Sequence, residues 1–386
     1  MKYVIATSTY FDLPRFTARK LSDEGPHHLI NFIRKELDAE VIAPQTSKLN
    51  SNLNSGFTDE AKYVEKPYKG IRGRAEAFLD SIGSKLIGEK GHWQQARLIL
   101  SKIEDGDVIY STGQDIGLVI VLQSILKRKK PKLAIFMNDP DNVRVVFFGK
   151  IAFKFFPTMA VLVNTQTKKD SVVKKIKAKN VTVLIESTDE EFFTPSKTKL
   201  AENDKPLIVS CGLEKRDYKS LAEAMEGLGA STKICAASPN HNDLTRVRMP
   251  TSTPDDFEMR LFSFRELREL YRSADVVVIP LQKNNFSAGL TSLLEAIACG
   301  APCVITEESP LVAELLREKL ILGTVAENPE SIRKAINDVL ENKSESAERA
   351  KRAREYILSN HSSSAYLDQI TKILISVGST ESPVSI

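Results

Sequence analysis

The sequence predicts an α/β protein made of two Rossmann-like, doubly wound domains that face a cleft. Short apolar runs alternate with longer helical patterns along almost the whole chain, which is typical of βαβ units and parallel sheets. The alternation stops at a polar, charged segment near residue 200 and then begins again. The chain has 386 residues, more than one hydrophobic core normally organises, so two domains are expected.

The first domain is predicted to span residues 1–198. Its buried strands are expected at residues 3–7, 39–43, 108–111, 133–137, 159–163 and 181–185. Its helices are expected at residues 26–37, 93–103, 116–126 and 171–178. Residues 46–83 are polar and lack a clear period. We expect them to form a long loop, or two short elements, over the mouth of the sheet.

The second domain is predicted to span residues 199–358. Its strands are expected at residues 207–211, 233–236, 276–280 and 303–306. Its helices are expected at residues 218–226, 264–271, 290–298, 311–317, 331–340 and 347–358. Residues 359–386 are expected to form a helix that crosses back to the first domain and then a frayed tail.

The composition excludes several classes of protein. The net charge is only +4, and no recognised nucleic-acid motif is present, so nucleic acid is not an expected partner. No apolar run reaches the roughly 20 residues that span a bilayer. The first residues lack a cleavage site and resemble a buried strand. We therefore expect a cytoplasmic protein whose cysteines are free, buried and reduced, namely Cys211, Cys235, Cys299 and Cys303.

The segment that carries the chemistry follows the predicted strand at residues 276–280. A polar loop leads into Ser287-Ala288-Gly289, and a helix with one apolar stripe follows over residues 290–298. The first N–H groups of a helix are unpaired, and the helix dipole makes this end positive. Because the side chains there are small, a phosphate or a sugar hydroxyl can approach these groups.

Glu295 lies on the same predicted helix, at the edge of the apolar stripe next to Thr291. It stands about one turn from the helix start, so its carboxylate can be directed at vicinal hydroxyls. A carboxylate is the usual acceptor for ribose hydroxyls in nucleotide sites. The alternative is an ordinary solvated helix glutamate, and the residues alone do not decide between the two.

The order strand, proline, polar loop and Ser287-Ala288-Gly289-Leu290-Thr291 with Glu295 resembles the donor site of family-4-type retaining glycosyltransferases (group 1) of the GT-B fold. Residues 208–221 resemble the first strand and loop of that family's nucleotide domain, and residues 267–275 resemble the helix before the donor strand. Asp189, Phe193 and Pro195 resemble its interdomain connection. The resemblance covers residues 181–320, and before that it is only topological.

The resemblance implies an acceptor-binding first domain and a second domain that binds a nucleoside-diphosphate sugar. It implies transfer of a hexosyl group to an acceptor hydroxyl with retention, without a metal or other cofactor. The acceptor would be a sugar, a lipid-linked molecule or a small molecule. A soluble acceptor would make the chain similar to a sugar-phosphate synthase. The donor-site residues would be Gly212, Ser287, Ala288, Gly289, Leu290, Thr291 and Glu295.

The sequence departs from the family pattern at two positions. The family's glutamate pair falls on Ser287 and Glu295, so only the second glutamate is present. The family's diphosphate-binding arginine falls on Leu213, and the nearest cations are Lys215 and Arg216. We assign these two cations to the leaving diphosphate, because fixed donors near developing charge are effective in catalysis. The departures leave open a catalytically silent protein that only binds a sugar nucleotide or a partner.

Acceptor-side candidates lie in the first domain. Asn138 and Asp139 follow a predicted strand, and Asp139-Pro140-Asp141 could form a metal site, a turn with a helix cap, or an acceptor contact. His28 stands where the family often places a histidine facing the cleft, and it could orient the acceptor or carry a proton.

Three other histidines, His92, His241 and His361, have no evident partners in sequence and are expected at the surface.

Residues 127–179 hold 14 Lys and Arg against three Asp, and aromatic residues lie between the basic ones. This pattern is compatible with docking on an anionic membrane surface, which would place the protein on the inner face of a membrane. The alternative is a buried aromatic helix under the sheet with solvated lysines.

Overall fold

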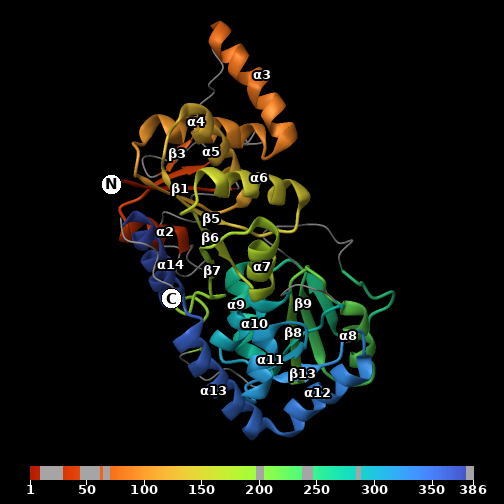
Figure 1. Cartoon of the computed structure of the whole chain (residues 1–386). Helices are drawn as coiled ribbons and strands as arrows, with labels where there is room; N and C mark the ends of the chain where they lie inside the picture. The colour runs from red at the N-terminus through yellow and green to blue at the C-terminus, as the bar shows by residue number, and fades with distance from the viewer. Residues whose placement is uncertain are drawn as a thin grey trace. The chain divides into compact units, whose positions relative to one another are not determined.

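The structure is a computed structural model of the chain (Figure 1). It describes residues 1–8, 29–43, 61–63, 70–196, 204–236, 247–283 and 288–379. These residues divide into two compact units, one made of residues 1–8, 29–185 and 366–379 and the other of residues 186–365. Each unit contains one parallel sheet, so the predicted α/β class with two Rossmann-like domains is confirmed.

The first unit is organised by a seven-stranded parallel sheet in the order β3-β2-β1-β4-β5-β6-β7. The strand order reverses between β1 and β4, whose carboxyl ends are therefore the usual ligand-binding edge of such a sheet. The strands are β1 (Tyr3–Ala6), β2 (Glu40–Ala43), β3 (Ala61–Tyr63), β4 (Val108–Ser111), β5 (Lys132–Phe136), β6 (Ala160–Val163) and β7 (Val181–Val183).

Helices cover both faces of this sheet. They are α2 (Leu29–Glu36), α3 (Gly70–Leu86), α4 (Lys90–Lys102), α5 (Gln114–Lys127), α6 (Val143–Phe155), α7 (Gln166–Ser171), the π-helical turn η3 (Val172–Ile176) and α14 (Ser363–Gly378). Two differ from prediction. The helix expected at residues 171–178 begins earlier, where the Thr165 hydroxyl accepts the Lys168 N–H at 3.2 Å. The loop expected over residues 46–83 contains β3 and most of α3.

The helix α3 was missed because the segment around it is polar and the helix itself contains three glycines. From residue 73 to residue 86, the buried residues of this helix are Gly73, Asp80 and Gly83, and the large apolar side chains are exposed. The apolar stripe of this helix faces outward, and Gly70, Gly73 and Gly83 lower the helix propensity of the segment.

The second unit contains a six-stranded parallel sheet in the order β10-β9-β8-β11-β12-β13. The strands are β8 (Leu207–Cys211), β9 (Ser231–Cys235), β10 (Phe257–Arg260), β11 (Val276–Ile279), β12 (Cys303–Thr306) and β13 (Leu322–Thr324). The helices are α8 (Tyr218–Met225), α9 (Phe264–Ser273), α10 (Leu290–Ala298), α11 (Pro310–Arg317), α12 (Pro329–Glu341) and α13 (Lys343–Asn360). Prediction missed β10 and β13, which are short, partly exposed edge strands.

Alternate residues of β8 face two different helical layers. Val209 and Cys211 pack in a cluster with α9, α10 and α13, whereas Ile208 packs in a cluster with α8 and α12. The central strands of this sheet are buried on both faces, as expected for a doubly wound sheet. The helix α10 is thus held against the sheet along its whole length.

The link between the units belongs to the second one. Phe192 and Phe193 are buried in its core with ring centroids 4.9 Å apart, and the Arg268 guanidinium lies 4.6 Å from the Phe192 ring centroid. The division therefore falls after Ile185, and residues 186–196, which we had assigned to the first domain, pack with the second unit. Most of α14 belongs to the first unit, where the Lys132 ammonium donates to the Gly378 carbonyl at 2.7 Å.

Within the described ranges, no helix combines the length and the apolar character needed to cross a membrane.

The packing of α3 on α4 gives a test of the fold. A Cβ on Gly83 would collide with the indole of Trp93, whose N–H is fixed by the Ile87 carbonyl at 3.0 Å. Alanine is the better helix former by about 1 kcal/mol, but overpacking costs about 1–3 kcal/mol. We expect Gly83→Ala to lower the free energy of unfolding, measured by urea titration of the fluorescence of Trp93, the single tryptophan.

The control is Ser84→Ala, a half-buried neighbour on the same helix, which we expect to change stability by less than about 1 kcal/mol. A Gly83→Ala protein more stable than the wild type would show that α3 does not pack on Trp93 in this way.

Candidate functional site

The candidate site lies where the strand order of the second sheet reverses, between β8 and β11. Ligands of open α/β sheets bind beyond the carboxyl ends of the strands at such a point. Here the loop of residues 212–217 follows β8, and the chain that follows β11 leads into α10. The structure thus brings together, from distant parts of the sequence, the two segments that the sequence singled out.

Backbone hydrogen bonds fix the loop after β8 to the end of β11. The Asp217 N–H donates to the Pro280 carbonyl, and the Gln282 N–H donates to the Lys215 carbonyl, both at 2.9 Å. The Gln282 side-chain amide also donates to the Arg216 carbonyl at 3.0 Å. These three bonds hold Lys215, Arg216 and Asp217 of the loop against the chain at the end of β11.

Arg216 is buried beneath this loop, with 3% of its surface exposed. Its guanidinium donates to the Cys211 carbonyl at 2.7 Å, to the Glu214 carbonyl at 2.9 Å and to the Ser292 hydroxyl at 3.1 Å. These bonds tie the end of β8 to the first turn of α10. A buried cation requires such partners, because burial without them is costly.

Gly212 and Lys215 both have positive φ angles, +104° and +56°. A Cβ on Gly212 would collide with the Arg216 guanidinium, so glycine is required here for space as well as for backbone conformation. Lys215 is half-buried, in contrast to the fully buried Arg216. Of the two predicted diphosphate-binding cations, Lys215 is thus the more accessible, while three acceptors of the protein occupy Arg216.

The N-terminus of α10 has the small-residue geometry that the sequence predicted. Gly289 is its N-cap with φ +83°, and a Cβ there would lie 2.9 Å from the Ile279 side chain. Ala288 and Leu290 have buried side chains, so these two residues can offer a ligand only their backbone groups. Thr291 is exposed in the first turn.

Glu295 is buried, so the alternative of an ordinary solvated helix glutamate is wrong. It is 8% exposed, and the Tyr271 hydroxyl donates to its Oε2 at 3.3 Å. Burial raises the pKa of this carboxyl well above its usual range, and the nearby Cys211 raises it further. The Tyr271 hydrogen bond and the Arg216 charge act in the opposite direction but are smaller effects. Glu295 therefore joins α10 to α9 inside the second unit.

Sequence reasoning missed the groups that hold these side chains. Tyr271 is fully buried on α9, and Ser292 faces β8 from α10. The signal for Ser292 was present, because a hydroxyl on the buried side of an apolar helix needs a partner. Ser287 and His28, two further predicted site residues, lie outside the described residues.

The acceptor-side candidates lie in the first unit. Asn138 and Asp139 are exposed after β5, and the Asp139 N–H donates to the Gln114 side chain at 2.9 Å. Asp141 pairs with Lys175 at 2.7 Å, which lowers the pKa of its carboxyl. Asn142 caps α6. These contacts fit the turn and helix-cap interpretation, and the described residues hold no cluster of three or more metal-ligating side chains.

His92 corrects the expectation that it lies at the surface, because it is buried at the carboxyl ends of β1 and β4. Its Nδ1 accepts the Glu89 N–H at 3.0 Å, so Nε2 carries the proton and donates to the Ser8 carbonyl at 2.7 Å. The Ser8 hydroxyl donates to Asp115 at 2.9 Å. This polar group stands at the ligand-binding edge of the first sheet. His361 is half-buried and bonds to the Glu186 carbonyl at 2.7 Å, whereas His241 lies outside the described residues.

The aromatic helix predicted within residues 127–179 is α6. Val145, Gly149 and Ala152 form its buried face, whereas Phe147 and Phe155 are more than half exposed. Phe148, Phe153 and Phe156 pack against the core of the first unit, so the alternative of a packed aromatic helix holds for part of α6, and membrane docking of this stretch stays a prediction.

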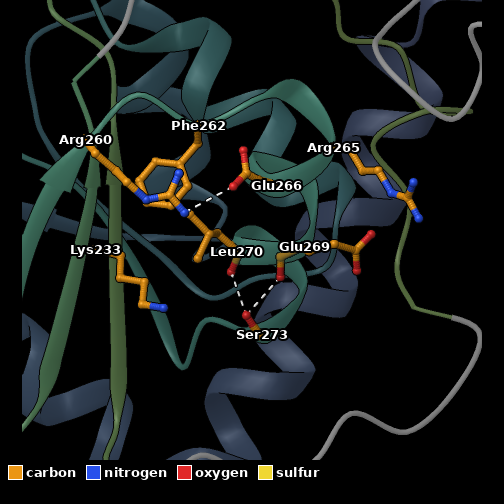
Figure 2. Close-up of a pocket in the computed structure, with 8 residues that line it drawn as sticks. All are labelled: Lys233, Arg260, Phe262, Arg265, Glu266, Glu269, Leu270 and Ser273. Atoms are coloured by element: carbon orange, nitrogen blue, oxygen red, sulfur yellow. Dashed lines mark hydrogen bonds and ion pairs between the residues drawn. The ribbon is translucent and has the colours of Figure 1, made fainter.

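A pocket lies beside the edge strands of the second sheet (Figure 2). The Arg260 guanidinium stacks on Phe262 at 3.6 Å from the ring centroid and pairs with Glu266 at 3.1 Å. Glu258 neutralises the same cation from 2.7 Å. The charge of Arg260 is thus already paired. The lining residues are Lys233, Arg260, Phe262, Arg265, Glu266, Glu269, Leu270 and Ser273, none of which the sequence had assigned to the site.

Comparison with known proteins supports the resemblance seen in the sequence. Residues 253–356 match the family model described as Glycosyl transferases group 1. No curated protein sequence matches the chain.

Solved structures resemble the chain over almost its full length. Sucrose-phosphate synthase from Thermosynechococcus elongatus is 14% identical, with a TM-score of 0.66 and coverage of 97% of this chain and 98% of that one. Anabaena HepE in complex with UDP and glucose is 15% identical, with a TM-score of 0.61 over 97% and 99%. An α,α-trehalose-phosphate synthase (UDP-forming) from Burkholderia vietnamiensis is 13% identical, with a TM-score of 0.66 over 97% and 100%.

These comparisons confirm the GT-B fold, and they confirm the family resemblance over residues 253–356.

The buried carboxyl of Glu295 makes stability depend on pH. Because its pKa is raised in the folded state, its favourable contribution is complete below the unfolded pKa of about 4.3 and declines as pH rises. The decline has a slope of at most about 1.4 kcal/mol per pH unit. Glu295→Gln keeps an oxygen for Tyr271 but cannot ionise, so we expect it to be more stable than the wild type at pH 7.

Urea titrations from pH 4 to pH 8 measure this difference, which should shrink towards pH 4. Glu314→Gln, which neutralises a half-buried carboxylate on α11, is the control. A constant difference between the Glu295 variant and the wild type across this range would contradict a raised pKa.

Proposed function

We propose that this chain, which carries a glycosyl transferases group 1 segment within a GT-B fold, transfers a hexosyl group from a nucleoside-diphosphate sugar to an acceptor hydroxyl with retention. The supporting observation is the helix N-terminus at residues 288–291, which stands at the reversal of strand order in the second sheet. Unpaired amides and the positive end of the helix dipole stabilise phosphate at such a position.

The loop after β8 supplies the remaining donor contacts in this proposal. Gly212 and the amides of Ala288, Gly289 and Leu290 would lie against the phosphates, with Thr291 offering a hydroxyl. Lys215 would neutralise the leaving diphosphate, since it is more exposed than Arg216. Arg216 would act by fixing the loop against α10 through Cys211 and Ser292.

Glu295 is proposed to hold the ribose hydroxyls. Tyr271 engages Oε2 of its carboxyl, so Oε1 is the atom assigned to the sugar. A carboxyl held in one orientation by a buried tyrosine loses little entropy when it binds a hydroxyl. Ser287 is proposed to stand near the donor sugar, where the family's first glutamate is found.

The acceptor is proposed to be a sugar, a lipid-linked molecule or a small molecule, contacted by Asn138 and Asp139 and oriented by His28. Sucrose-phosphate synthase and trehalose-phosphate synthase are named for sugar phosphates, and HepE was solved with UDP and with UDP-glucose. We therefore propose a uridine diphosphate sugar as the first donor to test, and catalysis without a metal ion.

A catalytically silent sugar-nucleotide-binding or partner-binding protein is the second candidate. It is favoured by Leu213, which is buried where the family has an arginine, and by Arg216, whose guanidinium is occupied by protein acceptors. With fewer cations available, the site would bind the diphosphate but stabilise its departure less.

Lys215 provides a specific test of diphosphate binding. At a concentration one hundred times its Kd, UDP, GDP or ADP should stabilise the protein by about 2.7 kcal/mol, seen as a rise in Tm. Lys215→Met should weaken binding of that diphosphate about fivefold in calorimetry, because a half-exposed ion pair contributes about 1 kcal/mol. Binding of the parent nucleoside should not change.

Lys219→Met, on the first turn of α8, is the matched control and should bind like the wild type. If Lys215→Met lowered the affinity for the nucleoside and for the diphosphate equally, Lys215 would not contact the phosphates.

Donor hydrolysis separates the two candidate functions. With radiolabelled UDP-, GDP- or ADP-sugars, a glycosyltransferase should release free sugar slowly with at least one donor, and EDTA should leave the rate unchanged. The released anomer, identified by NMR before it equilibrates, should match the donor configuration. If a nucleoside diphosphate binds but no donor is hydrolysed, the silent candidate is favoured instead.

A further inference from the structure

The helix α3 packs in the reverse of the usual amphipathic arrangement. Its buried side carries Gly73, Asp80 and Gly83. Asp80 is fully buried and forms an ion pair with Arg97 of α4, and Gly83 lies against the Trp93 ring. The helix is therefore attached to the unit by a charge pair and a close backbone approach. A soluble helix normally turns its apolar stripe to the core.

The outward side of α3 carries the large apolar residues instead. Phe78 is 66% exposed, Leu79 60%, Ile82 45% and Leu86 51%. At about 100° per residue, these four side chains fall within one broad stripe opposite Asp80. Figure 1 shows α3 at the outer end of the layer formed with α4 and α5. A contiguous exposed apolar stripe of this kind marks an interaction surface.

Basic residues border the stripe on α3 itself. Arg74 and Lys85 are exposed, and the helical period places both along one margin of the stripe. The carboxylates of the helix, Glu76 and Asp80, fall on the side that faces the rest of the unit. The outward surface of α3 thus combines apolar side chains with positive charge.

The end of α5 adds more positive charge next to α3. Partial burial lowers the pKa of Lys127, and the nearby Arg97 lowers it further while Glu76 of α3 raises it, so Lys127 lies within electrostatic range of α3. Leu126 beside it is 77% exposed, and Arg128 and Lys130 follow as exposed cations. The basic stretch 127–179 therefore begins near the flank of α3 that carries Glu76, about 60° round the helix from Leu79 at the margin of the stripe.

We propose that α3 and residues 126–130 form a docking surface for an anionic lipid bilayer, with Phe78, Leu79, Ile82 and Leu86 inserted among the lipid headgroups. An amphipathic helix that lies in the interface buries its apolar side chains there and places lysine and arginine at the headgroup level. The sequence pattern placed membrane docking within residues 127–179. The proposal instead places it mainly on α3, and only the first residues of the basic stretch contribute. The proposal does not depend on the glycosyltransferase function.

Charge favours a bilayer over a second copy of the chain. In a symmetric dimer through this stripe, each surface would meet its own copy, and the cations of both would be brought together. Anionic headgroups neutralise the same cations, each of which contributes about 1 kcal/mol, or about fivefold in binding.

Flotation of the full-length protein with vesicles tests the proposal. Vesicles of phosphatidylcholine with phosphatidylglycerol should carry the protein, and vesicles of phosphatidylcholine alone should carry much less. Phe78→Ser/Ile82→Ser should weaken binding about tenfold or more, because two apolar side chains are lost from the interface. Lys127→Gln/Lys130→Gln should weaken it about fivefold for each charge, and high salt should remove that difference.

Leu261→Ser/Val325→Ser, which removes two exposed apolar residues from the second unit, is the matched control and should bind vesicles like the wild type. Each variant should keep the wild-type Tm, because the replaced side chains are exposed. Vesicle binding unaltered by Phe78→Ser/Ile82→Ser would overturn the proposal. So would a dimer in sedimentation equilibrium that this variant abolishes while wild-type protein fails to float with anionic vesicles.

Discussion

The guanidinium of Arg216 is the contact on which the candidate site depends. It lies inside the second unit and bonds to the end of β8, to its own loop and to the first turn of α10. A buried guanidinium tolerates few geometries, because each unpaired donor would be costly. The three partners therefore fix the loop and the helix N-terminus relative to one another. Gly212 completes the arrangement, since any side chain there would displace the guanidinium.

A second buried polar contact determines how α10 lies on α9. Tyr271 reaches across from α9 to the Glu295 carboxyl, and both residues are almost free of solvent. Together with Arg216, this contact places polar groups on the buried side of a helix that is otherwise apolar. Such networks specify one packing arrangement when every member has a partner. In the proposed site, the groups left for a ligand are the backbone amides at the helix start, Thr291, Lys215 and the Oε1 atom of Glu295.

In the first unit a buried polar contact also fixes a helix, but here the apolar side of that helix is left exposed. There a buried ion pair, between Asp80 and Arg97, attaches α3 to its neighbour and leaves the apolar side chains outside. The inward positions are small or charged, so the hydrophobic effect contributes little to holding α3 against α4. The exposed side chains of Phe78 and Ile82 can therefore contact an apolar partner, which we propose is a lipid bilayer.

The sequence by itself determined the α/β class, the strands β4, β8 and β12 to the residue, and α10 from Leu290 to Ala298. It did so because apolar periodicity and helix-terminating glycine are local signals. It also located the small residues at the start of α10. Edge strands such as β10 were missed because half-exposed residues carry no clear pattern. Only the tertiary structure decided that Glu295 and Arg216 are buried and that α3 faces outward. Those outcomes depend on Tyr271, Ser292 and Arg97, residues distant in sequence, whose side chains meet only after the sheets have assembled.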